Sequence, residues 1–429
     1  MMYRVFLVVM PLVASSTLAG CELFNLGSSE DTVVLDTAAP QKESMVAPDS
    51  GWTSLGYLPL PAGILGIDNK ATLQLRDLAL LPDGSVKVIF DSVTLSQMDP
   101  ITRVDMGILK DQTWTSDPLI SDVTGIVGGE YFSLSGVRVE QPNFTANLNG
   151  ALHVYDESIN ATWIDPSVWN YFFGEMSLIG LQRHTVVEGT FYIPYQKVGG
   201  VGLNRVAGTT ATPEADVAIW TNPQVMARNA IFAGDPAATS YVAYCEIEYG
   251  THAEYLLKTE LVLVKRDGGS AGSWSEVARQ ADVCGLNEYG TEQIGFTVAQ
   301  DVPQFFYVDE ALQQVVVLTP ETATTFTKAE IPVPTTGGIR LNVADGRAYV
   351  GFPDTTAGGR ATIARIDGGA LVTVGQPGLT TMAVTDGQTA WETTPELIAT
   401  KFLGGRVLGV LVNPSGSPFD VALEVVIAD

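Results

Sequence analysis

Short runs of apolar or alternating residues follow one another along residues 51–429. Most runs cover about four to eight residues and end at Gly, Asp, Asn or Pro, which is the length and punctuation of β-strands. A helix would instead repeat apolar residues three and four positions apart over a longer stretch. The pattern therefore predicts an all-β body.

Several of these runs share one form, in which a strand, an Asp-Gly type turn and a second strand follow one another. Leu78–Gly84 leads into SVKVIFD, Leu341–Gly346 into RAYVGFPD, and Met382–Gly387 into QTAWETT. Asn149-Gly150 and Glu188-Gly189 are looser copies. A tight two-residue hairpin needs positive φ, which glycine adopts readily. We therefore expect hairpins at these positions.

A second hairpin follows the clearer copies at a similar offset. It has a strand, a polar turn and then often an aromatic residue that opens a last strand. Segments 104–120, 261–279 and 315–331 have this form, and 361–375 keeps it without the aromatic residue. Successive turns lie 39 residues apart from Gly150 to Gly189 and 41 apart from Gly346 to Gly387. This is the spacing expected of propeller blades.

The body therefore resembles a β-propeller, in which four-stranded antiparallel sheets are arranged radially around a channel. The turn count favours seven blades, and six or eight blades also fit the spacing. A pair of β-sandwiches explains the repeated units less economically. The first and last blades must be joined, and two segments compete for that role, Trp52–Pro59 and Phe419–Ile427.

The N-terminus has the three parts of an export signal. Arg4 provides the positive charge, Phe6–Ala14 the apolar core, and Leu18-Ala19-Gly20 the small residues before cleavage. The apolar core is too short for a membrane span, which needs about 20 residues. Leu18-Ala19-Gly20-Cys21 resembles the lipobox of bacterial lipoproteins. The resemblance implies that residues 1–20 are a signal peptide and that Cys21 becomes the lipidated first residue.

Residues 21–50 are polar and acidic, without a sustained period, which is typical of a disordered tether. Fatty chains on Cys21 would hold the protein at a bilayer, because each buried methylene contributes about 0.8 kcal/mol. The lipoprotein resemblance implies the bacterial cell envelope. The residue directly after Cys21 is Glu22, whereas enteric lipoproteins that stay at the inner membrane have an Asp at this position. This favours the outer membrane, on its periplasmic face or at the cell surface.

The charge balance and the cysteines exclude some partners and suggest one crosslink. A formal net charge of −25 argues against nucleic acid, whose phosphates require a basic face. After Cys21 the only cysteines are Cys245 and Cys284. An even pair in an oxidising compartment is expected to form a disulfide. Two buried thiols are the alternative.

Motifs of catalysis or metal binding are missing from the sequence. His153, His184 and His252 are scattered singly, so we expect no metal site, no cofactor and no motif-defined catalytic residue. No nucleophile elbow, Walker loop or dinucleotide fingerprint occurs in a fitting context. RDGGSAGSW (266–274) resembles the turn of sialidase-type repeats, but it lacks their serine and is stretched before Trp274. We interpret it as a hairpin turn.

One aromatic-rich segment interrupts the repeat. Its exposed rings would form a partner-binding patch, whereas buried rings would pack between blades. The residues concerned are Trp163, Trp169, Tyr171, Phe172 and Phe173.

Taken together, the sequence predicts a membrane-anchored, non-catalytic binding or scaffold module with a protein or glycan partner in the envelope. The alternative is a carbohydrate-active hydrolase, resembling sialidase or glycosidase propellers. Such an enzyme would use two carboxylates in the central funnel.

Overall fold

The computed structural model is built almost entirely from antiparallel sheets, and all described residues belong to the compact unit 36–429. The described residues are 43–59, 66–67, 70–71, 73–80, 83–96, 99–124, 132–133, 143–148, 151–156, 185–197, 199–207, 210–222, 224–249, 256–281, 283–284, 294–322, 325–344, 346–383, 396–403, 406–414 and 421–428.

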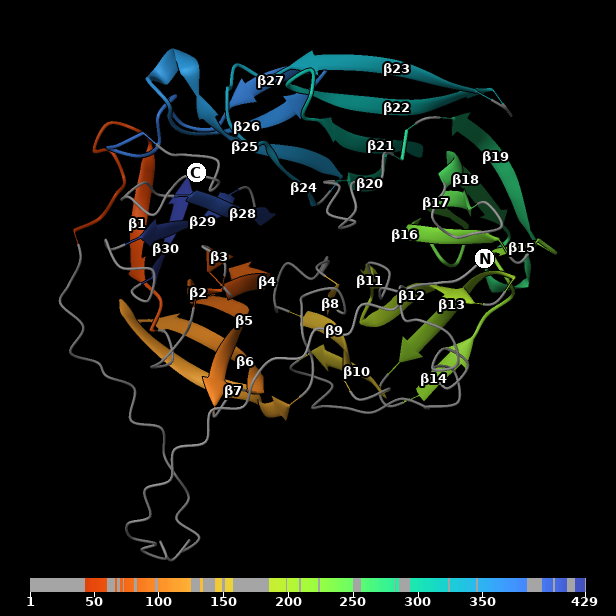
Figure 1. The fold of residues 1–429 in the computed structure, drawn as a ribbon, viewed down its shortest axis with the longest axis horizontal. Coiled ribbons are helices and arrows are strands. Elements are labelled where there is room, and N and C mark those ends of the chain that lie inside the picture. The colour runs from red at the N-terminus through yellow and green to blue at the C-terminus, as the bar shows by residue number, and fades with distance from the viewer. Residues whose placement is uncertain are drawn as a thin grey trace, which may run out of the picture. The chain divides into compact units, whose positions relative to one another are not determined.

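Seven sheets of three to five strands follow one another along the chain (Figure 1). Sheet 1 contains β4 (Leu73–Leu80), β5 (Val86–Ser96), β6 (Asp99–Lys110) and β7 (Thr113–Thr124). Sheet 2 contains β8 (Phe132–Ser133), β9 (Asn143–Leu148) and β10 (Ala151–Asp156). Sheet 3 contains β11 (Thr185–Val187), β12 (Thr190–Lys197), β13 (Gly200–Ala207), β14 (Thr210–Pro213) and β15 (Ala218–Ile219).

The next three sheets each have four strands in sequence order. Sheet 4 contains β16 (Val225–Gly234), β17 (Thr239–Tyr249), β18 (Leu256–Asp267) and β19 (Trp274–Ala281). Sheet 5 contains β20 (Ile294–Ala299), β21 (Val302–Asp309), β22 (Gln314–Thr322) and β23 (Thr325–Pro332). Sheet 6 contains β24 (Arg340–Ala344), β25 (Arg347–Asp354), β26 (Arg360–Asp367) and β27 (Ala370–Thr373).

Sheet 7 joins the two ends of the body. It contains β28 (Glu396–Leu403), β29 (Arg406–Pro414), β30 (Val421–Ala428) and, on its outer edge, β1 (Trp52–Tyr57). A small hairpin of β2 (Gly66–Ile67) and β3 (Lys70–Ala71) lies between β1 and sheet 1 in the sequence. The helices among the described residues are the short 3₁₀ turns η4 (Gly269–Ala271) and η5 (Thr355–Ala357), and neither is long and apolar enough to cross a bilayer.

Contacts between strands link neighbouring sheets from sheet 3 through sheets 4 to 7 and on to sheets 1 and 2. β16 contacts β12 and β20, β20 contacts β24, and β24 contacts β28. β28 then contacts β4, and β4 contacts β9, so the last sheet packs against the first (Figure 1). Radial sheets whose first strands converge are the architecture of a β-propeller. The prediction of an all-β propeller with seven blades is confirmed.

Tight turns join the first two strands of the sheets, as the glycine pattern predicts. Gly84, Gly189 and Gly346 all have positive φ, at 84°, 77° and 72°. The Asn149-Gly150 turn lies outside the described residues. Most of the Met382–Gly387 copy, from residue 384 onward, also lies outside the described residues.

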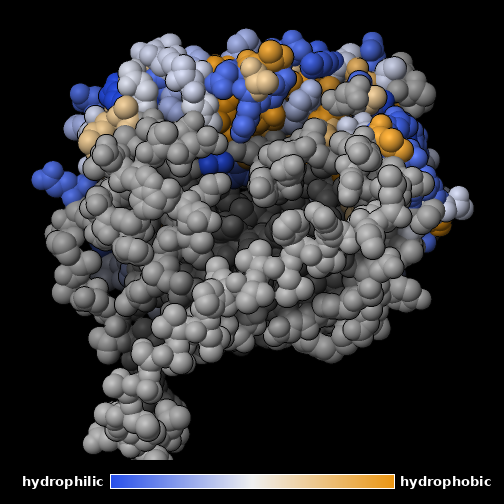
Figure 2. Space-filling model, in the orientation of Figure 1, coloured by the Kyte–Doolittle hydropathy of each residue, from blue (hydrophilic) through white to orange (hydrophobic). Residues whose placement is uncertain are grey.

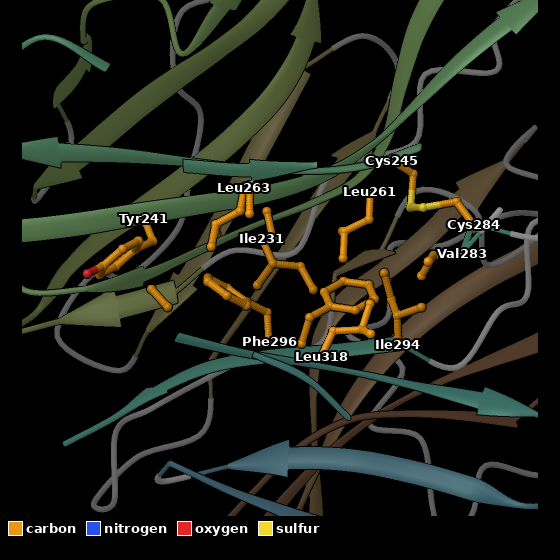
Figure 3. Packing of buried hydrophobic residues seen from close by; sticks show 14 of the residues in the cluster. Ile231, Tyr241, Cys245, Leu261, Leu263, Val283, Cys284, Ile294, Phe296 and Leu318 are labelled. Atoms are coloured by element: carbon orange, nitrogen blue, oxygen red, sulfur yellow. A yellow bond between two sulfur atoms is a disulfide. The ribbon is translucent and has the colours of Figure 1, made fainter. Parts of the chain in front are cut away.

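Apolar side chains fill the space between neighbouring sheets. Along β17 the side chains of Tyr241, Ala243 and Cys245 face sheet 5, whereas those of Val242 and Tyr244 face sheet 3. Both faces of the strand are therefore buried, which explains its nearly continuous apolar run. Figure 3 shows the sheet 4–sheet 5 layer, in which Leu261, Leu263, Phe296 and Leu318 meet. Burying each such side chain contributes about 1.5–3 kcal/mol.

Both candidate closing segments take part in ring closure. The segment proposed as Phe419–Ile427 contains β30, the third strand of sheet 7, and the Trp52–Pro59 segment contains β1, the fourth. Trp52 lies opposite Ala428, and Tyr57 opposite Glu424. The two alternatives are thus complementary, because a four-stranded last blade needs three strands from the C-terminus and one from the N-terminus.

The residues just before β1 are also part of the body. The N–H of Ala47 donates to the carbonyl of Leu379 at 2.8 Å, and the N–H of Gln376 donates to the carbonyl of Ser50 at 2.7 Å. The Met45 side chain is only 3% exposed. The predicted tether over residues 21–50 is therefore too long, since 43–50 pack against the connection that leaves sheet 6. We call residues 43–58 the strap.

A buried carboxylate fixes the strap to sheet 7. Glu424 is completely buried, and its two carboxylate oxygens accept from the N–H of Met45, at 2.9 Å, and from the hydroxyl of Ser54. The indole of Trp52 donates to the carbonyl of Val374 beside sheet 6, and the indole of Trp114 in sheet 1 donates to the carbonyl of Leu55. The strap therefore links sheets 6, 7 and 1.

We predict that Glu424→Leu will lower the free energy of unfolding by about 2–4 kcal/mol, because it leaves two buried donors without an acceptor. Denaturant titration of the folded protein measures this loss. Ser54→Ala removes only one of the two hydrogen bonds and should cost about 1 kcal/mol. Wild-type stability in Glu424→Leu would contradict the assigned role of the carboxylate.

Candidate functional site

The two ends of the propeller differ in the length of their loops. At one end, the turn end, the described first hairpins of sheets 3, 4 and 5 turn at 188–189, 235–238 and 300–301. At the opposite end, the connection end, the described chain leaves sheets 3, 5 and 6 through the longer segments 214–222, 333–339 and 374–383. Binding residues concentrate on longer loops that a rigid scaffold positions. The connection end is therefore the candidate binding face.

The first strands around the channel carry few carboxylates. β9, β11, β16, β20 and β24 contain neither Asp nor Glu. Asp77 on β4 and Glu396 on β28 are the carboxylate residues in the first strands of the seven sheets. These two strands belong to neighbouring sheets and contact each other. The fold thus places the two acidic residues on one side of the ring.

The cysteines that the sequence pairs are bonded to each other in the structure. Cys245 lies on β17 and Cys284 lies just beyond β19, with 5.9 Å between their Cα atoms. Both are 1% exposed, and Figure 3 shows them at the edge of the apolar layer beside Val283. The bond ties the second strand of sheet 4 to the start of the connection toward sheet 5. It therefore fixes one loop of the candidate face.

A charge cluster lies on the outer strands of sheet 4. Arg279 donates to Glu276 at 2.8 Å, to Glu246 at 2.9 Å and to Glu260, which also pairs with Lys258 at 2.7 Å. Burial alone would raise the pKa of Glu260, but the hydrogen bonds from Lys258 and Arg279 outweigh it and lower the pKa. The Glu260 carboxylate is therefore held ionised by its ion pairs, which suits it to ion pairing and not to donating a proton.

A buried arginine lies between sheets 3 and 4 near the turn end. Arg266 is 0% exposed, forms an ion pair with Glu214, and lies 4.7 Å from the ring centre of Trp274. The guanidinium Nε and Nη2 of Arg266 and the indole nitrogen of Trp274 have no hydrogen-bond partner within the described part of the chain. This arrangement supports interpreting RDGGSAGSW as a structural turn, because its arginine and tryptophan pack on each other.

Hydrophobic exposure on the drawn face is limited. Figure 2 shows the apolar side chains of the described residues in small patches separated by hydrophilic ones. Scattered apolar residues of this kind are ordinary on a protein surface. The most exposed large apolar side chains among the described residues are Ile219, Leu257, Val302, Leu312, Val372 and Met382.

Several predicted site residues lie outside the described residues. His153 is on β10, while His184 and His252 are not described. Where the structure is described, no group of three or more His, Cys, Asp or Glu side chains could hold a metal ion. The undescribed candidates also include Cys21 and the aromatic residues Trp163, Trp169, Tyr171, Phe172 and Phe173.

Sequence reasoning missed the roles of four residues, Arg266, Glu424, Asp77 and Glu396. Glu424 had a usable signal, because it is the one charged residue in the apolar strand VALEVVIA. A charge there must be paired or hydrogen-bonded. Asp77 and Glu396 had no such signal, since 319 positions separate them and only the closed ring brings their strands together.

We predict that Arg266→Met will destabilise the fold by about 3–5 kcal/mol, because it leaves the buried carboxylate of Glu214 unpaired. The double variant Arg266→Met, Glu214→Met should recover part of that loss. Arg279→Met, at a side chain that is 30% exposed, is the control and should cost about 1 kcal/mol or less. Unfolding free energies of the four proteins decide the matter, and additive losses would contradict a direct coupling.

Comparison with known proteins finds fold-level similarity alone. No family model and no curated protein matches the chain. The β-propeller domain of the Trilobed protease from Pyrococcus furiosus is 7% identical, with 82% of this chain and 93% of that one covered and a TM-score of 0.44. An alpha-L-arabinanase from Penicillium chrysogenum, complexed with arabinobiose, is 11% identical, with 73% and 98% covered and a TM-score of 0.39. Similarities of this size assign no relative and no activity.

Proposed function

We propose that the protein is a lipid-anchored, non-catalytic binding module of the bacterial cell envelope, which holds its partner at the connection end of the propeller. The lipid would be carried by Cys21, and the outer membrane is the proposed location. The partner is a protein or a glycan of the envelope. The fold supports this proposal with a closed, rigid ring that carries its longer loops on one face.

The observation that carries the proposal is that the N-terminal strap takes part in ring closure. The first described residues after the lipobox, the strap, are built into the closure of sheets 6, 7 and 1. A load on an N-terminal anchor would therefore be transmitted to the whole ring through many hydrogen bonds. An N-terminus that serves as both anchor and closing strand suits a protein that must stay folded while it holds a partner at a membrane.

The disulfide supports export of the protein. Structural disulfides persist in oxidising compartments and are rare in the cytosol of most organisms. Cys245 and Cys284 are joined although 39 positions separate them, and both are buried. This agrees with the export signal at residues 1–20, which the sequence predicts independently.

A second candidate function is a carbohydrate-active hydrolase. It is favoured by one observation, the placement of Asp77 and Glu396 on contacting first strands of the ring. Glycosidases of most families need a pair of carboxylates on either side of the scissile bond.

We predict that Cys21→Ser will abolish lipid attachment, because the thiol that carries the acyl chains is removed. Metabolic palmitate labelling followed by membrane fractionation measures this. The wild type should be labelled and membrane-bound, whereas the variant should be unlabelled and either soluble or an uncleaved precursor. Cys245→Ser with Cys284→Ser is the matched control and should keep the label. Palmitate retained in Cys21→Ser would refute the anchor.

We predict that the wild type will release no reducing sugar from a panel of neutral and acidic polysaccharides, and that Asp77→Asn with Glu396→Gln will behave identically. Asp83→Asn, at the turn end, is the control. If the wild type and the control release reducing sugar and the double variant does not, the protein is a hydrolase and the proposal of a non-catalytic binding module is wrong.

A further inference from the structure

Three neighbouring loops at the connection end have no charged side chain. They are residues 333–339, 355–359 and 374–383, which we call the platform. The 22 residues of the platform would contain about four charged ones at the chain's overall 17%. The loops are instead rich in Thr, Gly and Pro, in a protein whose formal net charge is −25. This neutral surface therefore differs in composition from the rest of the molecule.

Hydrogen bonds fix the platform loops to one another or to sheet 6. The carbonyl of Pro334 accepts from both the N–H and the hydroxyl of Thr355, each at 2.9 Å. The hydroxyl of Thr380 accepts from the N–H of Ala361 at 3.1 Å and donates to the carbonyl of Met382 at 2.7 Å. Thr380 is completely buried. A surface fixed in this way loses little conformational entropy when a partner binds.

The exposed part of the platform has the composition of an interface centre. Protein interfaces are depleted of charge at their core and enriched in Met. The Met382 side chain is 48% exposed, and Arg360, whose Nε donates to the carbonyl of Ala357, lies at the rim. Without a cluster of cations the platform suits neither nucleic acid nor anionic lipid. The other exposed side chains are Pro334, Thr336, Thr355, Thr356, Gln376, Pro377, Thr381 and Ala383.

The strap enters the body directly beside the platform. Val46 pairs with Thr380, and the N–H of Thr381 donates to the carbonyl of Met45 at 2.8 Å. Residue 43 therefore lies at the connection end. Only the 22 residues from Cys21 to Lys42 separate this point from the proposed lipid. Such a chain reaches at most about 70–80 Å when fully extended, and about 25 Å on average when flexible.

We infer that the platform faces the membrane that holds the protein and docks the uncharged surface of a second protein held on that same membrane. The inference rests on the proposed lipid anchor. The position of residue 43 gives the direction, because the chain leaves the body from the platform side. The composition of the platform gives the chemistry of the partner, since an uncharged face avoids both repulsion by the acidic body and the cost of burying unpaired charges.

The orientation is tested with the full-length, lipidated protein in phosphatidylethanolamine–phosphatidylglycerol vesicles. A donor dye is attached at Thr336→Cys or Thr381→Cys on the platform, or at Ala370→Cys, exposed at the turn end of the same sheet. The engineered thiol is the reactive one, because Cys245 and Cys284 are bonded and Cys21 is acylated. Energy transfer to acceptor-labelled headgroups should be higher from both platform positions than from Ala370→Cys. Equal or reversed transfer would overturn the inference.

The partner is tested by photocrosslinking from the same three positions in intact envelopes. We expect a protease-sensitive adduct with a membrane protein from Thr336→Cys and Thr381→Cys, and none from Ala370→Cys. A charge introduced into the platform, as in Thr336→Asp with Thr381→Cys, should abolish the adduct, whereas Ala370→Asp with Thr381→Cys should retain it.

A protease-resistant polysaccharide adduct, an adduct from all three positions, or none at all would reject a protein partner at the platform. Palmitate labelling of each variant keeps this test separate from that of the proposed function. A labelled protein without the expected adducts contradicts only the inference, whereas an unlabelled protein contradicts the anchor itself.

Discussion

Ring closure by the N-terminal strand is the constraint on which the rest of the structure depends. Sheet 7 takes three strands from one end of the body and the fourth, β1, from the other. The closure is made over nearly the whole chain length, so its entropic cost must be offset by many contacts made together.

The closure relies on Glu424 in a way that apolar packing could not replace. Met45 and Val46 of the strap pack into the apolar cluster between sheets 6 and 7, and the peptide groups of the strap need partners once they are buried. The Glu424 carboxylate of sheet 7 and the carbonyl of Leu379, in the connection that leaves sheet 6, supply such partners. Polar contacts here fix the register of the strap, while the strength of the ring comes from the apolar layers between sheets, such as that of Ile231, Phe296 and Leu318.

The sequence predicts local features of this fold well and long-range ones poorly. Positive φ at Gly84, Gly189 and Gly346 follows from the turn alone, so these hairpins could be placed from the residues themselves. Burial of residues 43–50 could not, because their composition is that of a tether and their order comes from residues more than 300 positions away. For the same reason the two candidate closing segments could not be ranked, since a blade accepts both.

In the candidate site, too, local features could be predicted from the sequence and long-range ones could not. Cys245 and Cys284 are recognisable because there are so few cysteines, whereas the platform is a composite of three loops that are neutral individually and unremarked in the sequence. It can be recognised only in the structure, in which Thr355 bonds to Pro334 and Thr380 bonds to Ala361 of sheet 6. Short hairpins are constrained by strand twist at the turn end, so the connection end is where composition can vary without loss of the fold. A neutral surface maintained there, in so acidic a protein, is therefore better explained by binding than by folding.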